Sequence, residues 1–272
     1  SHAAVYADFP ITVKNYTGNK SHSEAYTGQI ARHSLHNSAK KLVSKGASLE
    51  QTRAYFNAKD EGRKIIDPVS KEGFPVLETH VDAISKGKNL SGKAYKGLMS
   101  GMPGSLTGVE LLDLMIEKAA TTQKGFDPLT GYDYTQLISK FTMGAVFYNQ
   151  AVDNYLDEKL AADVNPNDKA YKEGKPYTGK EHVWDEAFGY FGAPAHTMEL
   201  TAADVYGIAK QKVDSFEKAD YNQDGKVSLI TEMAFAHAYY AAAFDKGGKT
   251  KYLHTIVPVS YTHLTLPTIY SV

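Results

Sequence analysis

Apolar residues recur every three or four positions along most of this chain, with polar residues between them. This spacing places the apolar side chains on one face of an α-helix. The strict alternation that is typical of strands is nearly absent, and the β-branched residues are scattered. The pattern predicts an all-α fold with about eight helices, arranged as an up-and-down helical bundle or bundles.

The predicted helices have start and stop signals as well as apolar stripes. Ser48, Thr107 and Thr201 are each followed three residues later by Gln, Glu or Asp, which is the spacing of an N-terminal cap. Gly46 is placed to end the first helix, and Gly192 to end the sixth. The segments that we expect to be helical are residues 25–45, 48–58, 77–86, 107–122, 137–155, 181–190, 201–216 and 230–244.

The most regular apolar stripe lies on the fifth predicted helix. Its members follow one another at intervals of four, four, three, four and three, which predicts a buried face. The last predicted helix, residues 230–244, is apolar on nearly every face, so we expect it to be central. The stripe consists of Leu137, Phe141, Ala145, Tyr148, Val152 and Tyr155.

Composition shifts along the chain suggest its domain organisation. Residues 1–23 mix Tyr, Thr, Asn, Gly and Pro and predict an irregular N-terminal arm. Residues 24–257 are expected to form a single all-α domain, or two sub-bundles divided near the polar stretch 163–180. The tail 258–272 follows a proline and carries no helical stripe, so we expect it to lie outside the core.

The densest chemistry lies on the predicted helix 181–190. His182, Asp185 and Glu186 are spaced at i, i+3 and i+4 and would share one helix face. An imidazole beside two carboxylates is a ligand set for iron or zinc. The alternative is a solvated charged face. Trp184 and Phe188 are expected to point into the bundle from the other side.

A second motif has the spacing of an EF-hand calcium loop. Oxygen-bearing residues stand at loop positions 1, 3 and 5, with Gly225 at position 6 for the turn. Position 12 departs from the motif, because Thr231 stands there and the carboxylate comes one residue later. The alternative is an ion-free turn. The candidate calcium ligands are Asp220, Asn222, Asp224, Lys226 through its backbone carbonyl, Ser228 and Glu232.

His196 and Glu199 are secondary candidates for metal binding. They stand three residues apart, which would bring them together on a helix. However, Pro194 precedes them and Thr201 is placed to cap the next helix, so this pair is expected in a loop.

The bulk composition excludes several classes of protein. Thirty basic and 31 acidic residues leave a net charge of −1, which does not favour a nucleic-acid partner. No apolar run is long enough to span a membrane. The lack of Cys excludes disulfides and thiolate chemistry. The motifs of serine hydrolases, NTPases and zincins are also missing, so the sequence indicates no catalytic residues and favours a binding protein over an enzyme.

Three stretches of the chain resemble the bacterial family called domain of unknown function 4856. They are residues 25–32, residues 144–156, and the block Trp184-Asp-Glu-Ala-Phe-Gly-Tyr-Phe-Gly-Ala-Pro194 with the preceding His182. The likeness implies an exported protein in the periplasm or on the surface of a Gram-negative bacterium, compatible with a lipid anchor upstream. Separately, residues 260–272 resemble a translated sequencing adapter.

That family is similar in outline to the imelysin-like proteins, which are helical bundles of the cell envelope linked to iron uptake. Their Gly-x-His-x-x-Glu motif differs here, since Gly179 lies three residues before His182 and Glu186 four after it. The resemblance implies a protein that binds a metal ion or a metal-bearing small ligand in iron acquisition. The alternatives are an imelysin-type metal-dependent hydrolase and a structural or interaction module stapled by calcium.

Overall fold

The computed structural model describes residues 11–71, 73–160 and 164–265, with side chains to residue 258. The regular secondary structure of this described part is helical, with isolated β-bridges and no strand, so the predicted all-α fold is confirmed. Nine α-helices are present in the described residues. None of them is both long enough and apolar enough to cross a membrane.

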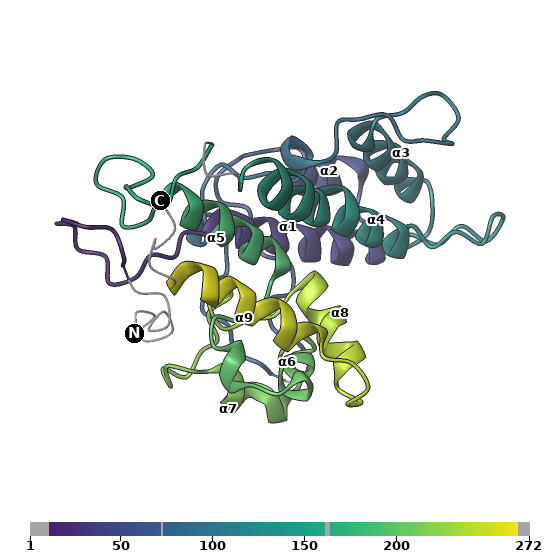
Figure 1. Cartoon of the computed structure of the whole chain (residues 1–272). Helices are drawn as coiled ribbons and strands as arrows, with labels where there is room; N and C mark the ends of the chain where they lie inside the picture. Colours follow the sequence, from purple (N-terminus) through teal and green to yellow (C-terminus); the bar gives the residue numbers. More distant parts are fainter. Residues whose placement is uncertain (1–10, 72, 161–163, 266–272) are drawn as a thin grey trace. The chain divides into compact units, whose positions relative to one another are not determined.

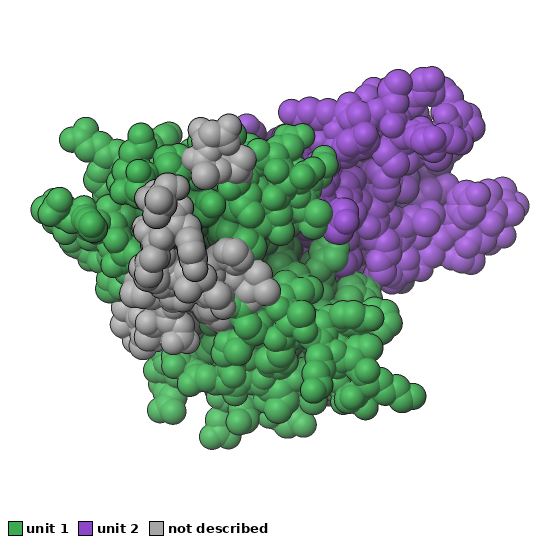
Figure 2. All heavy atoms as spheres, viewed as in Figure 1, with its two compact units in different colours: residues 1–27, 69–77, 151–272 green, residues 28–68, 78–150 purple. Residues whose placement is uncertain are grey.

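The chain divides into two compact units (Figure 2). Unit 1 comprises residues 1–27, 69–77 and 151–272, and unit 2 comprises residues 28–68 and 78–150. The polar stretch 163–180 therefore lies within unit 1. Segments of the two units therefore alternate along the chain. Figure 1 colours the chain by residue number, from purple to yellow.

Unit 2 is built from α1 to α4, of which α2 packs on α3 and α3 on α4. Ala31, Leu35 and Ala39 of α1 are fully buried, as the apolar line of that helix predicts. Gly46, with a φ of 75°, follows the helix as predicted. Ser48 and Gln51 form the complete capping box of α2. The bounds are α1 Thr27–Ser44, α2 Leu49–Phe56, α3 Gly108–Ala120 and α4 Tyr134–Thr142, with 3₁₀ turns at Val81–Ala83 and Ser91–Lys93.

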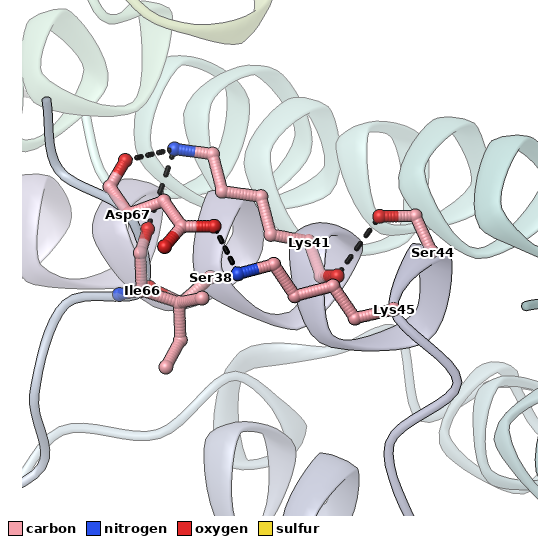
Figure 3. A network of polar contacts seen from close by, with 6 residues as sticks. All are labelled: Ser38, Lys41, Ser44, Lys45, Ile66 and Asp67. Atoms are coloured by element: carbon pink, nitrogen blue, oxygen red, sulfur yellow. Dashed lines mark hydrogen bonds and ion pairs between the residues drawn. The ribbon is translucent and has the colours of Figure 1, made fainter. Parts of the chain in front are cut away.

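The C-terminal half of α1 holds the loop around residue 67 (Figure 3). Lys41 Nζ donates to the carbonyl oxygens of Asp67, at 2.7 Å, and Ile66, at 3.3 Å. Lys45 forms an ion pair with the Asp67 carboxylate, and the Ile66 backbone N–H donates to Ser38 Oγ at 3.1 Å. Burial lowers the pKa of Lys41. The loop is thus fixed to the helix by backbone and side-chain groups together.

The predicted helix at residues 77–86 is wrong, because only the 3₁₀ turn Val81–Ala83 forms there. The backbone N–H of Val81 donates to Arg63 and that of Leu77 to Val227, both distant in sequence. These partners replace the i−4 carbonyls that an α-helix would use. Val81 and Ile84 are nevertheless buried, so the apolar spacing reports burial without a helix.

The predicted stripe on the fifth helix is also wrong in its register. Of its six members, Ala145 and Tyr155 are buried as predicted. Leu137, Tyr148 and Val152 are exposed, whereas their neighbours Ile138 and Val146 are buried. The α-helix α4 gives way at Met143–Glu158 to a π-helix, which carries more residues per turn. One α-helical period therefore does not follow the buried face through the π-helical segment, where Tyr148 and Val152 are exposed. The exposed Leu137 lies before the change of period, in α4.

Unit 1 contains α5 to α9, in which α6 packs on α8, and α9 packs on α5 and α8. Asp245 at the end of α8 accepts hydrogen bonds from the backbone N–H groups of Tyr252, at 3.1 Å, and Leu253, at 2.7 Å, which begin α9. The bounds are α5 Gly179–Phe191, α6 Ala202–Ala209, α7 Phe216–Ala219, α8 Ala236–Asp245 and α9 Tyr252–Thr265, with 3₁₀ turns at Thr197–Glu199 and Val213–Ser215.

Two expectations for the end of the chain differ from the structure. The last predicted helix begins at Ala236 instead of residue 230, and Phe244 on it is exposed. The α-helix α9 was not predicted, and it continues through Pro258 to Thr265, so the predicted tail starts inside a helix. Residues 266–272 lie outside the described part of the chain.

Candidate functional site

The helix α5 is buried on almost every side, although its sequence is acidic. Thr178 caps it: the backbone N–H of Glu181 donates to Thr178 Oγ1 at 3.1 Å, and Glu181 Oε1 accepts from the Thr178 N–H at 3.0 Å. Glu181 Oε1 also accepts from Thr12 Oγ1 at 3.0 Å. Trp184 and Phe188 are buried, as predicted. The solvated face that was the alternative interpretation of this helix does not exist at Glu181 or Asp185, which are 1% and 0% exposed.

The three predicted metal ligands of α5 do not converge. His182 Nε2 lies 2.6 Å from Glu186 Oε1, so these two residues form a pair. Asp185 instead accepts a hydrogen bond from the backbone N–H of Ala25, at 3.2 Å through Oδ2. The side chains of successive helix residues such as Asp185 and Glu186 point about 100° apart. Asp185 therefore contacts Ala25, whereas Glu186 contacts His182 of the same helix. Within the described ranges, no group of three or more His, Asp or Glu side chains is placed to hold a metal ion.

His182 is held by aromatic rings as well as by Glu186. Its imidazole stacks on Tyr171, with centroids 4.3 Å apart, and on Tyr177, at 5.2 Å. Burial raises the pKa of the Tyr177 hydroxyl, with Asp185 adding to the effect. The pair His182–Glu186 therefore belongs to a stacked cluster beside the acidic part of the helix.

A residue that the sequence analysis missed, Glu24, completes the acidic group around Asp185. The two carboxyl groups lie within hydrogen-bonding reach of each other. Burial raises the pKa of Glu24 to about 8 and that of Asp185 well above its ordinary value, and the charge of Glu181 adds to both effects. The pair therefore holds a proton at neutral pH. No sequence motif marks it, since Glu24 is the single acidic residue between Asp8 and Glu50.

Glu24 lines a cavity of about 360 Å³ in unit 1. Apart from the proton that Glu24 shares with Asp185, its carboxyl oxygens have no hydrogen-bond partner among the described residues. Thr231 contributes a buried oxygen without a hydrogen-bond partner to the same wall. The wall also contains two tyrosine rings and two exposed lysines. The lining residues with polar, charged or aromatic side chains include Glu24, Thr231, Tyr26, Tyr177, Lys20 and Lys175.

The predicted calcium loop is compact, and Glu232 reaches into it from its late position. Its Oε1 accepts from the backbone N–H of Ser228 at 2.9 Å and its Oε2 from that of Asn222 at 3.3 Å. Asp220 accepts from the N–H groups of Asp224, at 3.2 Å, and Gly225, at 2.9 Å. Burial raises the pKa of Glu232. The loop thus gathers its predicted oxygen-bearing residues, and calcium binding stays a prediction.

The remaining predicted ligands are Lys226 of the calcium loop and the pair His196 and Glu199. Lys226 donates its backbone N–H to Asp224 Oδ1 at 3.0 Å, within the calcium loop. His196 is buried and its Nε2 lies 2.9 Å from the carbonyl oxygen of Lys218, and burial lowers the pKa of this ring. Glu199 is exposed in a single 3₁₀ turn. The pair His196 and Glu199 therefore lies in a loop segment, as expected.

Comparison with known proteins identifies one family. Neither a search of curated proteins nor a search of solved structures gives a match for this chain. A family model described as Domain of unknown function (DUF4856) matches residues 115–237, which include α5 and the calcium-type loop. The match confirms the predicted resemblance to the DUF4856 family over residues 115–237 of the chain.

Proposed function

We propose that this chain is a binding protein for a small ligand with a positively charged group, which unit 1 holds against Glu24. The observation that carries the proposal is the buried Glu24 carboxyl, which lines a cavity and whose hydrogen-bond partner among the described residues is only the Asp185 carboxyl. A buried carboxylate costs several kcal/mol unless it is paired. Without a ligand, the pair Glu24–Asp185 avoids this cost by keeping a proton. A cation would replace that proton.

An organic cation fits the site better than a bare metal ion. A transition-metal ion takes about four ligands in most protein sites, whereas the described residues offer no group of three His, Asp or Glu side chains. An ammonium or amidinium group needs only one or two carboxylates. The family resemblance implies a metal-bearing small molecule. Such a molecule would itself supply most of the atoms that coordinate the metal, so it is a second candidate for binding at Glu24.

The test is isothermal titration calorimetry with n-pentylammonium, Mn²⁺ and Zn²⁺. At least one of these probes should bind the wild type, and binding should release a proton, which is measured by comparing buffers with different ionisation enthalpies. Glu24→Gln should weaken binding at least tenfold. Glu217→Gln, which changes an exposed carboxylate outside the cavity, should leave it unchanged. Lack of binding by every probe, or equal binding by Glu24→Gln, would refute the proposal.

A specific observation favours a second function, the module stapled by calcium. Glu232 reaches the loop despite its late position, so the missing ligand at position 12 does not leave the loop without a carboxylate. Elemental analysis of protein purified with and without chelator separates this function from the first. About one equivalent of calcium would support the staple.

The predicted envelope location, the role in iron acquisition and the imelysin-type hydrolase rest on the family resemblance. Fractionation of cells that express the full-length protein tests the location. Incubation with peptides in the presence of Zn²⁺ or Fe²⁺ tests the hydrolase, and turnover that disappears on chelation would favour it over a binding protein.

A further inference from the structure

The cavity of unit 1 has charged groups of both signs in its wall. Glu24 is 7% exposed, so its carboxyl belongs to the inner part of the wall. Lys20 and Lys175 line the same cavity but are exposed, so their ammonium groups belong to the outer part. A ligand in this cavity therefore meets an acidic group inside and basic groups outside.

Thr231 gives independent evidence that the cavity is built for a polar ligand. It stands at position 12 of the calcium-type loop, far in sequence from Glu24, and it is 1% exposed. Its hydroxyl has no hydrogen-bond partner among the described residues. An unpaired buried hydroxyl costs about 1–3 kcal/mol, and a ligand with polar atoms would remove that cost.

We propose that the cavity binds a zwitterion of the amino-acid class, with its ammonium group at Glu24 and its carboxylate at Lys20 and Lys175. This inference rests on the proposed function, because it names the class of the cationic ligand. The hydroxyl of Thr231 can accept from the ammonium group or donate to the carboxylate. The rings of Tyr26 and Tyr177 supply the contact surface for an aliphatic side chain and a cation–π partner for the ammonium group.

Ligands of other charge fit the wall less well. A diamine would place its second positive group beside Lys20 and Lys175, and a dicarboxylate would place a negative group beside Glu24. A neutral sugar would leave the inner and outer charges without partners. The volume of about 360 Å³ lies at the small end of ligand pockets, which span about 300–1,000 Å³. A free amino acid or a short peptide is therefore the expected size.

Three compounds that differ in one group each test the inference by calorimetry at pH 8. L-Norleucine carries both charges, n-pentylammonium lacks the carboxylate, and hexanoate lacks the ammonium group. Wild type should bind norleucine at least tenfold more tightly than either of the other two. Lys175→Met keeps the aliphatic stem and should weaken norleucine at least fivefold, without changing the affinity for pentylammonium. Glu24→Gln should weaken both ammonium compounds.

The outcomes separate this inference from the function on which it rests. If pentylammonium binds as tightly as norleucine and Lys175→Met changes neither, the zwitterion is excluded while cation binding stands. If neither ammonium compound binds and the Mn²⁺ and Zn²⁺ titrations are also silent, both proposals fall. Because Lys175 is exposed, its variant is expected to fold, which circular dichroism checks. The test therefore does not depend on the Glu24 variant alone.

Discussion

The free energy of unfolding of the wild type should fall as pH rises, because Glu24 loses its proton. Replacing Glu24 with Gln should remove most of this pH dependence. The folded protein keeps a proton on Glu24 up to a pKa of about 8, whereas an exposed Glu loses it near 4.5. Between these values the folded state binds more protons than the unfolded state, so the free energy of unfolding falls with rising pH. The stabilising effect of the proton is complete below pH 4.5 and is lost by about pH 8.

The size of this loss follows from the two pKa values. Their difference is about 3.5, and each whole pKa difference corresponds to 1.36 kcal/mol, so the loss is about 5 kcal/mol. Such a loss is a large fraction of the 5–15 kcal/mol that stabilises a typical domain. Gln is close in shape to protonated Glu and does not ionise. Its amide can also donate to Asp185, which Glu24 cannot do once it has ionised.

Urea denaturation at pH 5 and at pH 9 measures the effect. Wild type and Glu24→Gln should differ by less than about 1 kcal/mol at pH 5, and the variant should be several kcal/mol more stable at pH 9. Glu199→Gln, at an exposed position, is the matched control and should follow the wild type at both pH values. If the difference between wild type and Glu24→Gln stays the same at both pH values, Glu24 is not a protonated buried acid.

Three further predictions concern the elements around the site. Millimolar calcium should raise the melting temperature, since a hundredfold excess over Kd adds about 2.7 kcal/mol, and Asp224→Ala should abolish the rise; identical melting curves in calcium and in chelator would mean an ion-free loop. Thr178→Ala should cost about 1 kcal/mol in urea denaturation, because it removes the cap of α5, whereas Thr178→Ser, which keeps the hydroxyl, should not. Gly192→Ala should cost about 1–2 kcal/mol, because φ is 89° at this C-cap, and Gly144→Ala, within a helix and next to open space, should cost nothing; equal effects of the two would contradict the role of the left-handed backbone.

The helices that could be predicted from sequence are those whose signals are local. Ser48 and Gln51 are three residues apart and form the predicted cap of α2, and Gly46 ends α1. The start of α9 had no such signal, because its backbone donors are satisfied by Asp245, seven and eight residues earlier. Local capping is visible in a sequence, whereas capping by a residue from the preceding helix depends on how the chain turns back.

The candidate site was harder to predict, because it depends on which neighbours each carboxyl meets. Helical spacing correctly brought His182 and Glu186 together, at 2.6 Å. The same spacing could not show that Asp185 meets Glu24, which lies 161 positions earlier in the chain by the numbering. The metal site and the solvated face that the sequence suggested for this helix both leave the carboxylates ionised, whereas two buried acids can instead share a proton.

The alternation of the two units along the chain has a consequence for synthesis. A ribosome that has released residues 1–150 has supplied every residue of unit 2, but only the arm and one short segment of unit 1. Unit 2 can then fold early from contacts within about 120 residues, whereas unit 1 must wait for residues 151–272. Until α5 emerges, Glu24 has no Asp185 beside it and stays in water. The acidic pair at the candidate site is therefore among the last contacts that the nascent chain can form.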